Sequence, residues 1–265
     1  SCLKKNNRVL LQISMKMLSV LLVIRNEEKQ LDKCLRTIMF ADEIIVVLDK
    51  SSDNSGKIAK KYTDKIFSGS WNIEGDRRNF GLDRCNGEWI FELDADERVS
   101  KKLQNEIIDI VKTSQFDWHA INVKNYLGDS VVKFGWGAYF GKSSYAGLFK
   151  RGMKIWGRQR VHPKITLTGR RGKSLENQLD HYYCKNISDL FKKLDSYSSA
   201  RALDMKDNKS RETMIRNVRR IFSRFWKCYF LRKGYKEKDY GLIIAIVASL
   251  YPLVSYLKYK MDLND

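Results

Sequence analysis

The sequence contains little proline and histidine, and its cysteines form no pattern. Its 265 residues include only two prolines, Pro163 and Pro252, so no proline-rich linker divides the chain. The five cysteines are odd in number and lie far apart, without a CxxC pair or zinc-ligand spacing. Reduced thiols inside a cell fit this pattern best, and we expect Cys34 to be a core residue of a helix.

A secretory signal is also missing from the beginning of the sequence. Residues 1–16 contain Lys4, Lys5 and Arg8, but the apolar run that follows is only Val9-Leu10-Leu11. This run is too short for the apolar region of a signal peptide. We therefore interpret residues 1–16 as an N-terminal extension that precedes the domain.

Negative charge is scarce in the second half of the chain. Residues 1–130 hold 21 Lys/Arg and 20 Asp/Glu, whereas residues 131–265 hold 29 and 11, so nearly all of the net charge of +19 lies there. Such a surface favours an anionic partner: nucleic acid, acidic lipid or a phosphorylated glycolipid.

Three apolar runs alternate with helical patterns in the first half. Residues 18–24, 43–48 and 89–93 are nearly continuous in apolar side chains, as expected for buried parallel strands. This alternation predicts an α/β fold with a doubly wound, mostly parallel sheet. Ligands bind beyond the carboxyl ends of such strands, where Arg25 and Asp49 follow the first two runs.

The third run ends in the acidic sequence Asp94-Ala95-Asp96-Glu97. Clustered carboxylates repel one another and favour a cation, and Mg²⁺ or Mn²⁺ held by one or two carboxylates and phosphate oxygens is a common arrangement. A solvated acidic turn before a helix near Ser100 is the alternative for an isolated D-x-D sequence.

Together, the runs SVLLVIRNEE, EIIVVLDKSSDNS and RRNFGLDRCNGEWIFELDADE resemble the family 2 glycosyltransferases, which have the GT-A fold. The resemblance covers about residues 17–265, is strongest over 18–98, and is closest to bacterial lipopolysaccharide-core beta-glucosyltransferases. It implies an inverting, metal-dependent enzyme that moves a sugar from a UDP-sugar to a lipid-linked or lipopolysaccharide-core saccharide.

The resemblance also implies roles for individual residues of the first half. Asp49 would contact the base of the nucleotide. Arg77 and Arg78 occupy a stretch that faces the donor in relatives. The nucleotide-sugar site would comprise Ile24, Arg25, Glu27, Asp49, Arg77, Asp94 and Ala95. The Mg²⁺ or Mn²⁺ ion would be held by Asp94, Asp96 and His181.

The catalytic base is where this sequence departs from its relatives. Many of them have His-Glu where this chain has His162-Pro163, so the glutamate is replaced. The remaining candidates for a catalytic base are His162, Glu176 and Asp180.

Aromatic residues between 134 and 145 would form a platform for a sugar, or a hydrophobic floor beneath the sheet.

The last 80 residues predict helices that associate with a membrane. Residues 211–233 alternate apolar and basic side chains at helical spacing, which suits an anionic bilayer surface or packing on the catalytic domain. Residues 240–257 carry no charge, and we favour a helix in the membrane interface over a single span. We expect the protein in the cytoplasm, at the inner face of the cell membrane.

These patterns divide the chain into a catalytic domain and a helical basic C-terminal extension. The catalytic domain would comprise a nucleotide-binding half, 17–98, and an acceptor half, 99–185, followed by helices at 186–265. A nucleic-acid-binding protein is the alternative outside the enzymes, although no nucleic-acid-binding motif is present, and a nucleotidyltransferase is the alternative among them.

Overall fold

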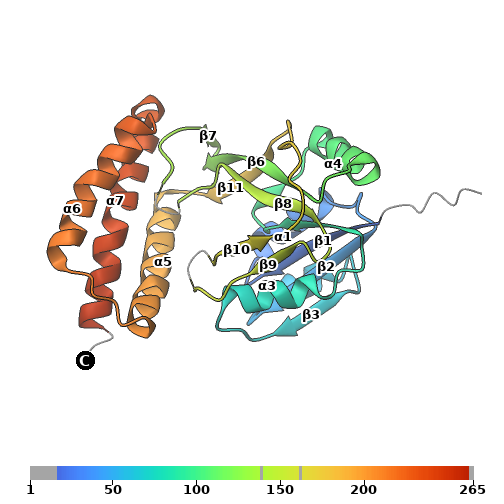
Figure 1. Ribbon diagram of the computed structural model, residues 1–265, viewed down its shortest axis with the longest axis horizontal. Helices are drawn as coiled ribbons and strands as arrows, with labels where there is room; N and C mark the ends of the chain where they lie inside the picture. Colours follow the sequence, from blue (N-terminus) through green and yellow to red (C-terminus); the bar gives the residue numbers. More distant parts are fainter. Residues whose placement is uncertain (1–16, 138–139, 161–162, 263–265) are drawn as a thin grey trace, which may run out of the picture.

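The computed structural model describes residues 17–137, 140–160 and 163–262. An α/β body carries the sheet, and three long helices stand together beside it (Figure 1). The predicted extension 1–16 lies outside the described residues, as does His162.

The first half of the body is the predicted parallel layer. Its strands lie in the order β3-β2-β1-β4 and all pair in parallel. They are β1 (Leu18–Ile24), β2 (Glu43–Asp49), β3 (Ile66–Gly69) and β4 (Trp89–Leu93). The helices between and after them are α1 (Glu28–Arg36), α2 (Ser55–Ala59), α3 (Glu74–Leu82) and α4 (Lys101–Thr113).

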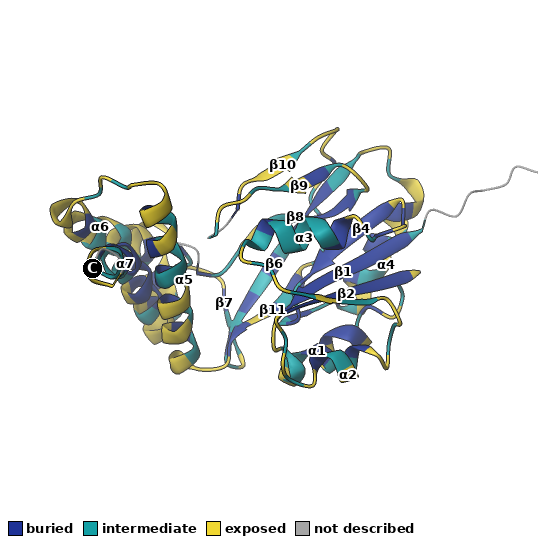
Figure 2. Cartoon of the chain, turned by 90° about the horizontal axis from the view of Figure 1, so that it is seen from below, coloured by how far each residue is buried: buried dark blue, intermediate teal, exposed yellow. Residues whose placement is uncertain are grey.

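Burial explains why the sequence alone predicts the strands of this layer. Every residue of β1, β2 and β4 is buried, as continuous apolar runs predict, and Figure 2 shows β1 and β4 in dark blue. Ile24 pairs with Leu48 in the register, and Leu22 pairs with Leu93. The three strands therefore end at one edge, where the polar residues that follow them meet.

The second half of the sheet is mixed rather than parallel. Strand β8 (Ser144–Lys150) lies antiparallel between β4 and β6 (Trp118–Leu127), and β11 (Leu179–Cys184) runs parallel to β6. The short strands are β5 (Glu97–Arg98), β7 (Ser130–Val132), β9 (Lys154–Trp156) and β10 (Ile165–Leu167). The parallel pairing expected of the sheet is thus found in its first half, while the second half is mixed.

The C-terminal residues form three packed helices, as predicted. They are α5 (Ile187–Asp207), α6 (Met214–Trp226) and α7 (Lys238–Met261), with two short turns, η1 (Lys227–Leu231) and η2 (Gly234–Glu237), between the last two. Helix α7 contacts both of the others, and its residues Ile244, Ala245 and Tyr251 are fully buried.

Helix α7 therefore serves as the core of this unit. By length and composition, one helix of the described chain, Gly234–Met261, could cross a membrane, yet 56% of its most apolar window is buried inside the protein. A core helix of a soluble unit has the same composition, so this helix does not by itself indicate a membrane span.

Candidate active site at the carboxyl edge of the sheet

A cavity of about 1730 Å³ opens where β1 and β4 end. The sheet forms one side of it, and residues 132–137 and 140–145 together with α5, α6 and η1 form the other. Most of the residues predicted for the donor and metal line this cavity: Ile24, Arg25, Glu27, Arg77, Asp94, Ala95, Asp96 and His181. The structure thus brings together side chains that lie up to 157 positions apart in the sequence.

The acidic sequence after β4 forms a closed turn. The backbone N–H of Asp94 donates to the Glu97 carboxylate at 2.8 Å, and the N–H of Glu97 donates to the Asp94 carbonyl at 3.0 Å. Strand geometry therefore ends at Leu93, and the turn, rather than the alternation of a strand, determines how Asp94 and Asp96 are presented. Glu97, the third carboxylate of this acidic sequence, is fully buried.

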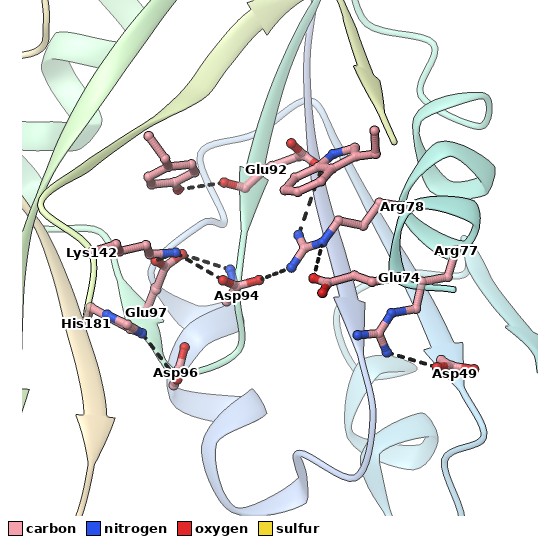
Figure 3. Close-up of polar contacts among 12 residues, drawn as sticks. Asp49, Glu74, Arg77, Arg78, Glu92, Asp94, Asp96, Glu97, Lys142 and His181 are labelled. Atoms are coloured by element: carbon pink, nitrogen blue, oxygen red, sulfur yellow. Dashed lines mark hydrogen bonds and ion pairs between the residues drawn. The ribbon is translucent and has the colours of Figure 1, made fainter. Parts of the chain in front are cut away.

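Two cations already bind the carboxylate of Asp94. Its oxygens lie 3.1 Å from Arg78 Nη2 and 3.1 Å from Lys142 Nζ, and Lys142 also lies 2.6 Å from Glu97 (Figure 3). Burial would raise the pKa of Asp94, but the charges of Lys142 and Arg78 outweigh it and lower that pKa. The predicted repulsion among these carboxylates is thus relieved by fixed positive charge from two other segments.

Arg78 is held in place by its own neighbours. Its Nε lies 2.9 Å from Glu74 one turn earlier in α3, and its guanidinium lies 4.7 Å from the centre of the Trp156 ring. The indole of Trp156 in turn donates to Glu92 at 2.9 Å. An arginine fixed on several sides loses little further freedom when it meets an anion.

Asp96 faces a histidine whose orientation is determined. Its carboxylate lies 3.4 Å from His181 Nε2 and 3.9 Å from Lys193 Nζ. Nδ1 of His181 lies 2.8 Å from the amide oxygen of Asn125, while the amide nitrogen of Asn125 donates to the Lys142 carbonyl at 2.8 Å. An amide oxygen only accepts, so Nδ1 of His181 carries a proton, and Nε2 is the ring nitrogen that faces the Asp96 carboxylate. Without a cation between them, Nε2 meets this carboxylate favourably only as a donor, whereas an unprotonated Nε2 is the form that binds a metal ion.

This pair has the chemistry of part of a divalent metal site. A carboxylate, an imidazole nitrogen and an outer amide that orients the ring are the groups that hold such ions in proteins. Within the described residues, no cluster of three Asp, Glu, His or Cys side chains comes close enough to form a complete site. Asp96 and His181 would therefore supply two ligands and leave the remaining positions to phosphate oxygens and water.

Asp49 lies at the end of β2, but it is not among the residues that line the cavity. One of its oxygens accepts from the Trp71 backbone N–H at 3.0 Å, and the other lies 2.9 Å from Arg77 Nη1. Asp49 therefore holds Arg77, which does line the cavity, and its predicted contact with the base remains a prediction.

The loop after β1 is tied to the loop after β2. The N–H of Glu27 donates to Ser55 Oγ at 2.9 Å, and the N–H of Ser52 donates to the Asn26 side chain at 2.8 Å. Asn26 has a φ of 54°, a left-handed conformation that asparagine adopts more readily than most residues. Burial, followed by the charge of Asp96, raises the pKa of Glu27 to about 7.

Two of the proposed bases do not line the cavity. The backbone N–H of Glu176 donates to Glu106 of α4 on another face of the protein, and Asp180 pairs with Lys124 at 2.8 Å. His162 lies outside the described residues. Residues that sequence reasoning missed include Asn125, Lys142 and Lys193, and their surroundings in the sequence contain no pattern that would have identified them.

The sheet order and the acidic turn after β4 define a GT-A fold. A family model, glycosyl transferase family 2, matches residues 19–160, which is more than half of the chain. The chain therefore belongs to family 2 of the glycosyltransferases, and it is an enzyme.

Relatives carry the same description at low identity. An uncharacterized glycosyltransferase of Rickettsia typhi is 23% identical over 253 residues, covering 88% of this chain and 83% of the relative. The lipopolysaccharide core biosynthesis glycosyltransferase LpsC of Rhizobium meliloti is 22% identical over 249 residues, covering 91% of each. Among solved structures, S. aureus TarS 1–349 in complex with UDP has 13% identity and a TM-score of 0.48, covering 92% of this chain and 91% of that one.

Proposed function

We propose that this enzyme transfers a sugar, with inversion, from a UDP-sugar to a saccharide acceptor that belongs to a lipid or a lipopolysaccharide core. The observation that carries the proposal is the pair Asp96 and His181, 3.4 Å apart at the edge of the cavity and next to the cation-bound Asp94. The cavity exceeds the roughly 300–1,000 Å³ typical of a site for one small ligand, so it has room for donor and acceptor together.

Asp96 and His181 would hold the Mg²⁺ or Mn²⁺ ion. When bound, such an ion neutralises the charge that develops on a departing diphosphate. Asp94 was also predicted as a ligand, but both of its oxygens are engaged by Arg78 and Lys142. We therefore assign Asp94 the role of fixing these two cations beside the diphosphate.

The cations of the site would act without reorganisation. Arg78 and Lys142 line the cavity and are held there by carboxylates, so both are in position before a ligand arrives. Such preorganised charge favours a transition state in which the bond to the leaving group is breaking. An acceptor hydroxyl then attacks the sugar from the opposite face, and no covalent enzyme intermediate is required.

The proton of that hydroxyl still needs an acceptor. Glu176 and Asp180 lie outside the cavity, so among the predicted bases His162 is the one whose neighbour, Pro163, lines it. His162 therefore stays the prediction for this role. A variant His162→Ala that keeps donor hydrolysis but loses transfer would support it, because only transfer needs the acceptor hydroxyl deprotonated.

Helix α6 would hold the enzyme at a membrane. Its outward side carries apolar residues that no other element covers, with exposed fractions of 81% for Ile215, 72% for Phe222 and 56% for Trp226. We call these three residues the α6 stripe. Exposed arginines, Arg216 and Arg219, lie on the same helix, and apolar side chains combined with basic ones match an anionic bilayer surface.

The likeness to LpsC supports a lipopolysaccharide-core acceptor, and an enzyme that uses such an acceptor would work at the cytoplasmic face of the cell membrane. Membership of the glycosyltransferase family argues against a nucleotidyltransferase. We propose no nucleic-acid partner, because the basic residues of α6 are interleaved with exposed apolar side chains.

A panel of nucleotide sugars tests the proposal. Each sugar is incubated with the enzyme and Mn²⁺ or with a chelator, and hydrolysis and thermal protection are measured. We expect at least one UDP-sugar to be hydrolysed and to raise the melting temperature only with the metal. Protection by no nucleotide sugar, or equal protection in the chelator, would contradict it.

A further inference from the structure

The lining of the cavity divides into two parts of different charge. Its five carboxylates all come from the first 96 residues: Glu27, Glu74, Glu92, Asp94 and Asp96. From residue 122 onward, the described lining contains no Asp or Glu and eight basic residues: Lys124, Lys133, Lys142, Arg160, Lys193, Arg224, Lys227 and Arg232. The described lining from residue 122 onward, which includes strand β6 as well as the helices, thus contributes basic side chains and no carboxylate, and it favours anions.

Most of these basic residues are already paired. Lys124 pairs with Asp180, Lys142 with Asp94 and Glu97, and Arg160 with Asp204 and Asp207. Lys193 lies 3.9 Å from Asp96. In the described part of the chain, no carboxylate lies within ion-pair distance, 4.0 Å, of Lys227 or Arg232 in η1 and the residue after it.

The position of Arg232 is nevertheless fixed. Its Nη1 donates to the Trp136 carbonyl at 2.5 Å, and a Cβ added to Gly137 would lie 2.2 Å from the same nitrogen. The segment 135–137 therefore packs directly against the guanidinium of Arg232. A cation held by a carbonyl, without a neutralising carboxylate, keeps its full charge for a ligand.

An aromatic path joins this cation to the proposed metal ligands. The rings of Trp136 and Tyr183 lie 5.3 Å apart, and Lys193 lies 3.9 Å from the Tyr183 ring and also 3.9 Å from Asp96. Aromatic side chains provide apolar faces with a polar tip, which suits the face of a sugar ring. The aromatic side chains thus lie between the proposed metal ligand Asp96 and the cation of Arg232, which has no carboxylate partner among the described residues.

We propose that the acceptor saccharide carries a phosphate group and that Lys227 and Arg232 bind it, while the sugar lies along Trp136, which packs on the buried ring of Tyr183. The inference rests on the proposed function, because it takes the other end of the cavity as the donor site. It names a substrate class, phosphorylated saccharides, and a specificity site that lies apart from the donor.

Binding of simple sugar phosphates tests this directly. The full chain is saturated with UDP and Mn²⁺, so that phosphate cannot enter the donor site, and glucose, glucose 6-phosphate and glycerol 3-phosphate are titrated by calorimetry or ligand-observed NMR. We expect glucose 6-phosphate to bind at least about tenfold more tightly than either of the others, since it alone offers both the sugar and the charge.

Variants then locate the site. In Lys227→Gln/Arg232→Gln the advantage of glucose 6-phosphate over glucose should fall to near one, and Arg232→Lys, which keeps the charge, should retain part of it. The matched control Lys192→Gln/Arg219→Gln removes two exposed cations outside the cavity lining and should keep the full advantage. Folding of each variant is followed by circular dichroism.

Three results would overturn the inference. If the wild type bound glucose and glucose 6-phosphate equally tightly, the protein would have no phosphate site. If the control variant lost the preference for glucose 6-phosphate as fully as Lys227→Gln/Arg232→Gln, the preference would come from the overall positive charge of the protein. If glycerol 3-phosphate bound as tightly as glucose 6-phosphate, Lys227 and Arg232 would be a site for the phosphate of a lipid headgroup and not for a phosphorylated sugar. A wild type that fails to bind UDP would contradict the proposed function itself, which is a separate outcome.

Discussion

The two sides of the cavity are built from different kinds of structure. The sheet side comes from buried parallel strands in a half of the chain with nearly balanced charge, and its carboxylates are fixed by Arg78 and Lys142. The other part of the lining comes from the mixed half of the sheet, glycine-containing turns and helices, and the charged side chains among its described residues are all basic. Under the proposed function, the first part would serve the transfer chemistry and the second would determine which acceptor is used.

The largest effect should follow from removing Asp96 on the sheet side. Asp96→Ala deprives the proposed metal of its carboxylate ligand, and we expect transfer and donor hydrolysis to fall roughly 100-fold or more. Asp83→Ala, at the exposed end of α3, is the matched control. Steady-state rates at saturating Mn²⁺ measure both, and full activity of Asp96→Ala would disprove the assignment of this side.

Asn125 should affect the metal through His181. Its amide oxygen determines which nitrogen of the ring is protonated, so Asn125→Leu frees the ring to rotate and to take the wrong tautomer. Mn²⁺ affinity in the presence of UDP should fall about 10–100-fold. Titration followed by electron paramagnetic resonance measures it, with Asn105→Leu on exposed α4 as control. An unchanged affinity would mean that His181 does not bind the ion.

Removing the α6 stripe should weaken membrane binding without affecting the donor site. Phe222→Ser/Trp226→Ser removes two exposed apolar side chains, and binding to phosphatidylglycerol vesicles should fall about tenfold or more. UDP affinity should not change, because the stripe is not part of the cavity lining. Co-sedimentation measures the binding, with Ile155→Ser on β9 as control. If the wild type ignores these vesicles, the stripe has another partner.

The smallest effect concerns Glu27 and pH. Burial raises its pKa from 4.5 to about 7, so the folded protein retains a proton that the unfolded chain has already released. As pH rises from 4.5 to 7, the wild type should therefore lose stability relative to Glu27→Gln, by about 1–2 kcal/mol once partial solvent access is allowed for. Above pH 7 the difference should stay constant. Urea unfolding at pH 5, 6, 7 and 8 measures it, and a difference independent of pH would contradict the burial of this carboxyl.

The same contrast explains how much the sequence could predict. Strands β1, β2 and β4 are buried on both faces, so their apolar runs were sufficient to place them and the polar residues after them. Helix α7 was also located from its uncharged run, and 56% of its most apolar window packs inside the protein, while its predicted contact with a membrane stays a prediction.

The other side could not be read in this way, because its site depends on long-range pairing. His181 meets Asn125 only because β11 lies beside β6 with these two residues in register, and no local pattern encodes that register. Lys142 likewise reaches Asp94 from a glycine-containing turn before β8, whose position between β4 and β6 is set by tertiary packing. The composition predicts the positive charge of this half of the chain, but it does not predict which of the basic residues line the cavity.

One titration tests the central claim most directly. UDP is titrated into the wild type and into Asp96→Ala by calorimetry, each with Mn²⁺ and with a chelator. If Asp96 and His181 hold the ion that binds the diphosphate, Mn²⁺ should tighten UDP binding to the wild type at least about tenfold and have no effect on the variant. An equal gain from Mn²⁺ in both proteins would contradict the account, because the metal would then bind elsewhere.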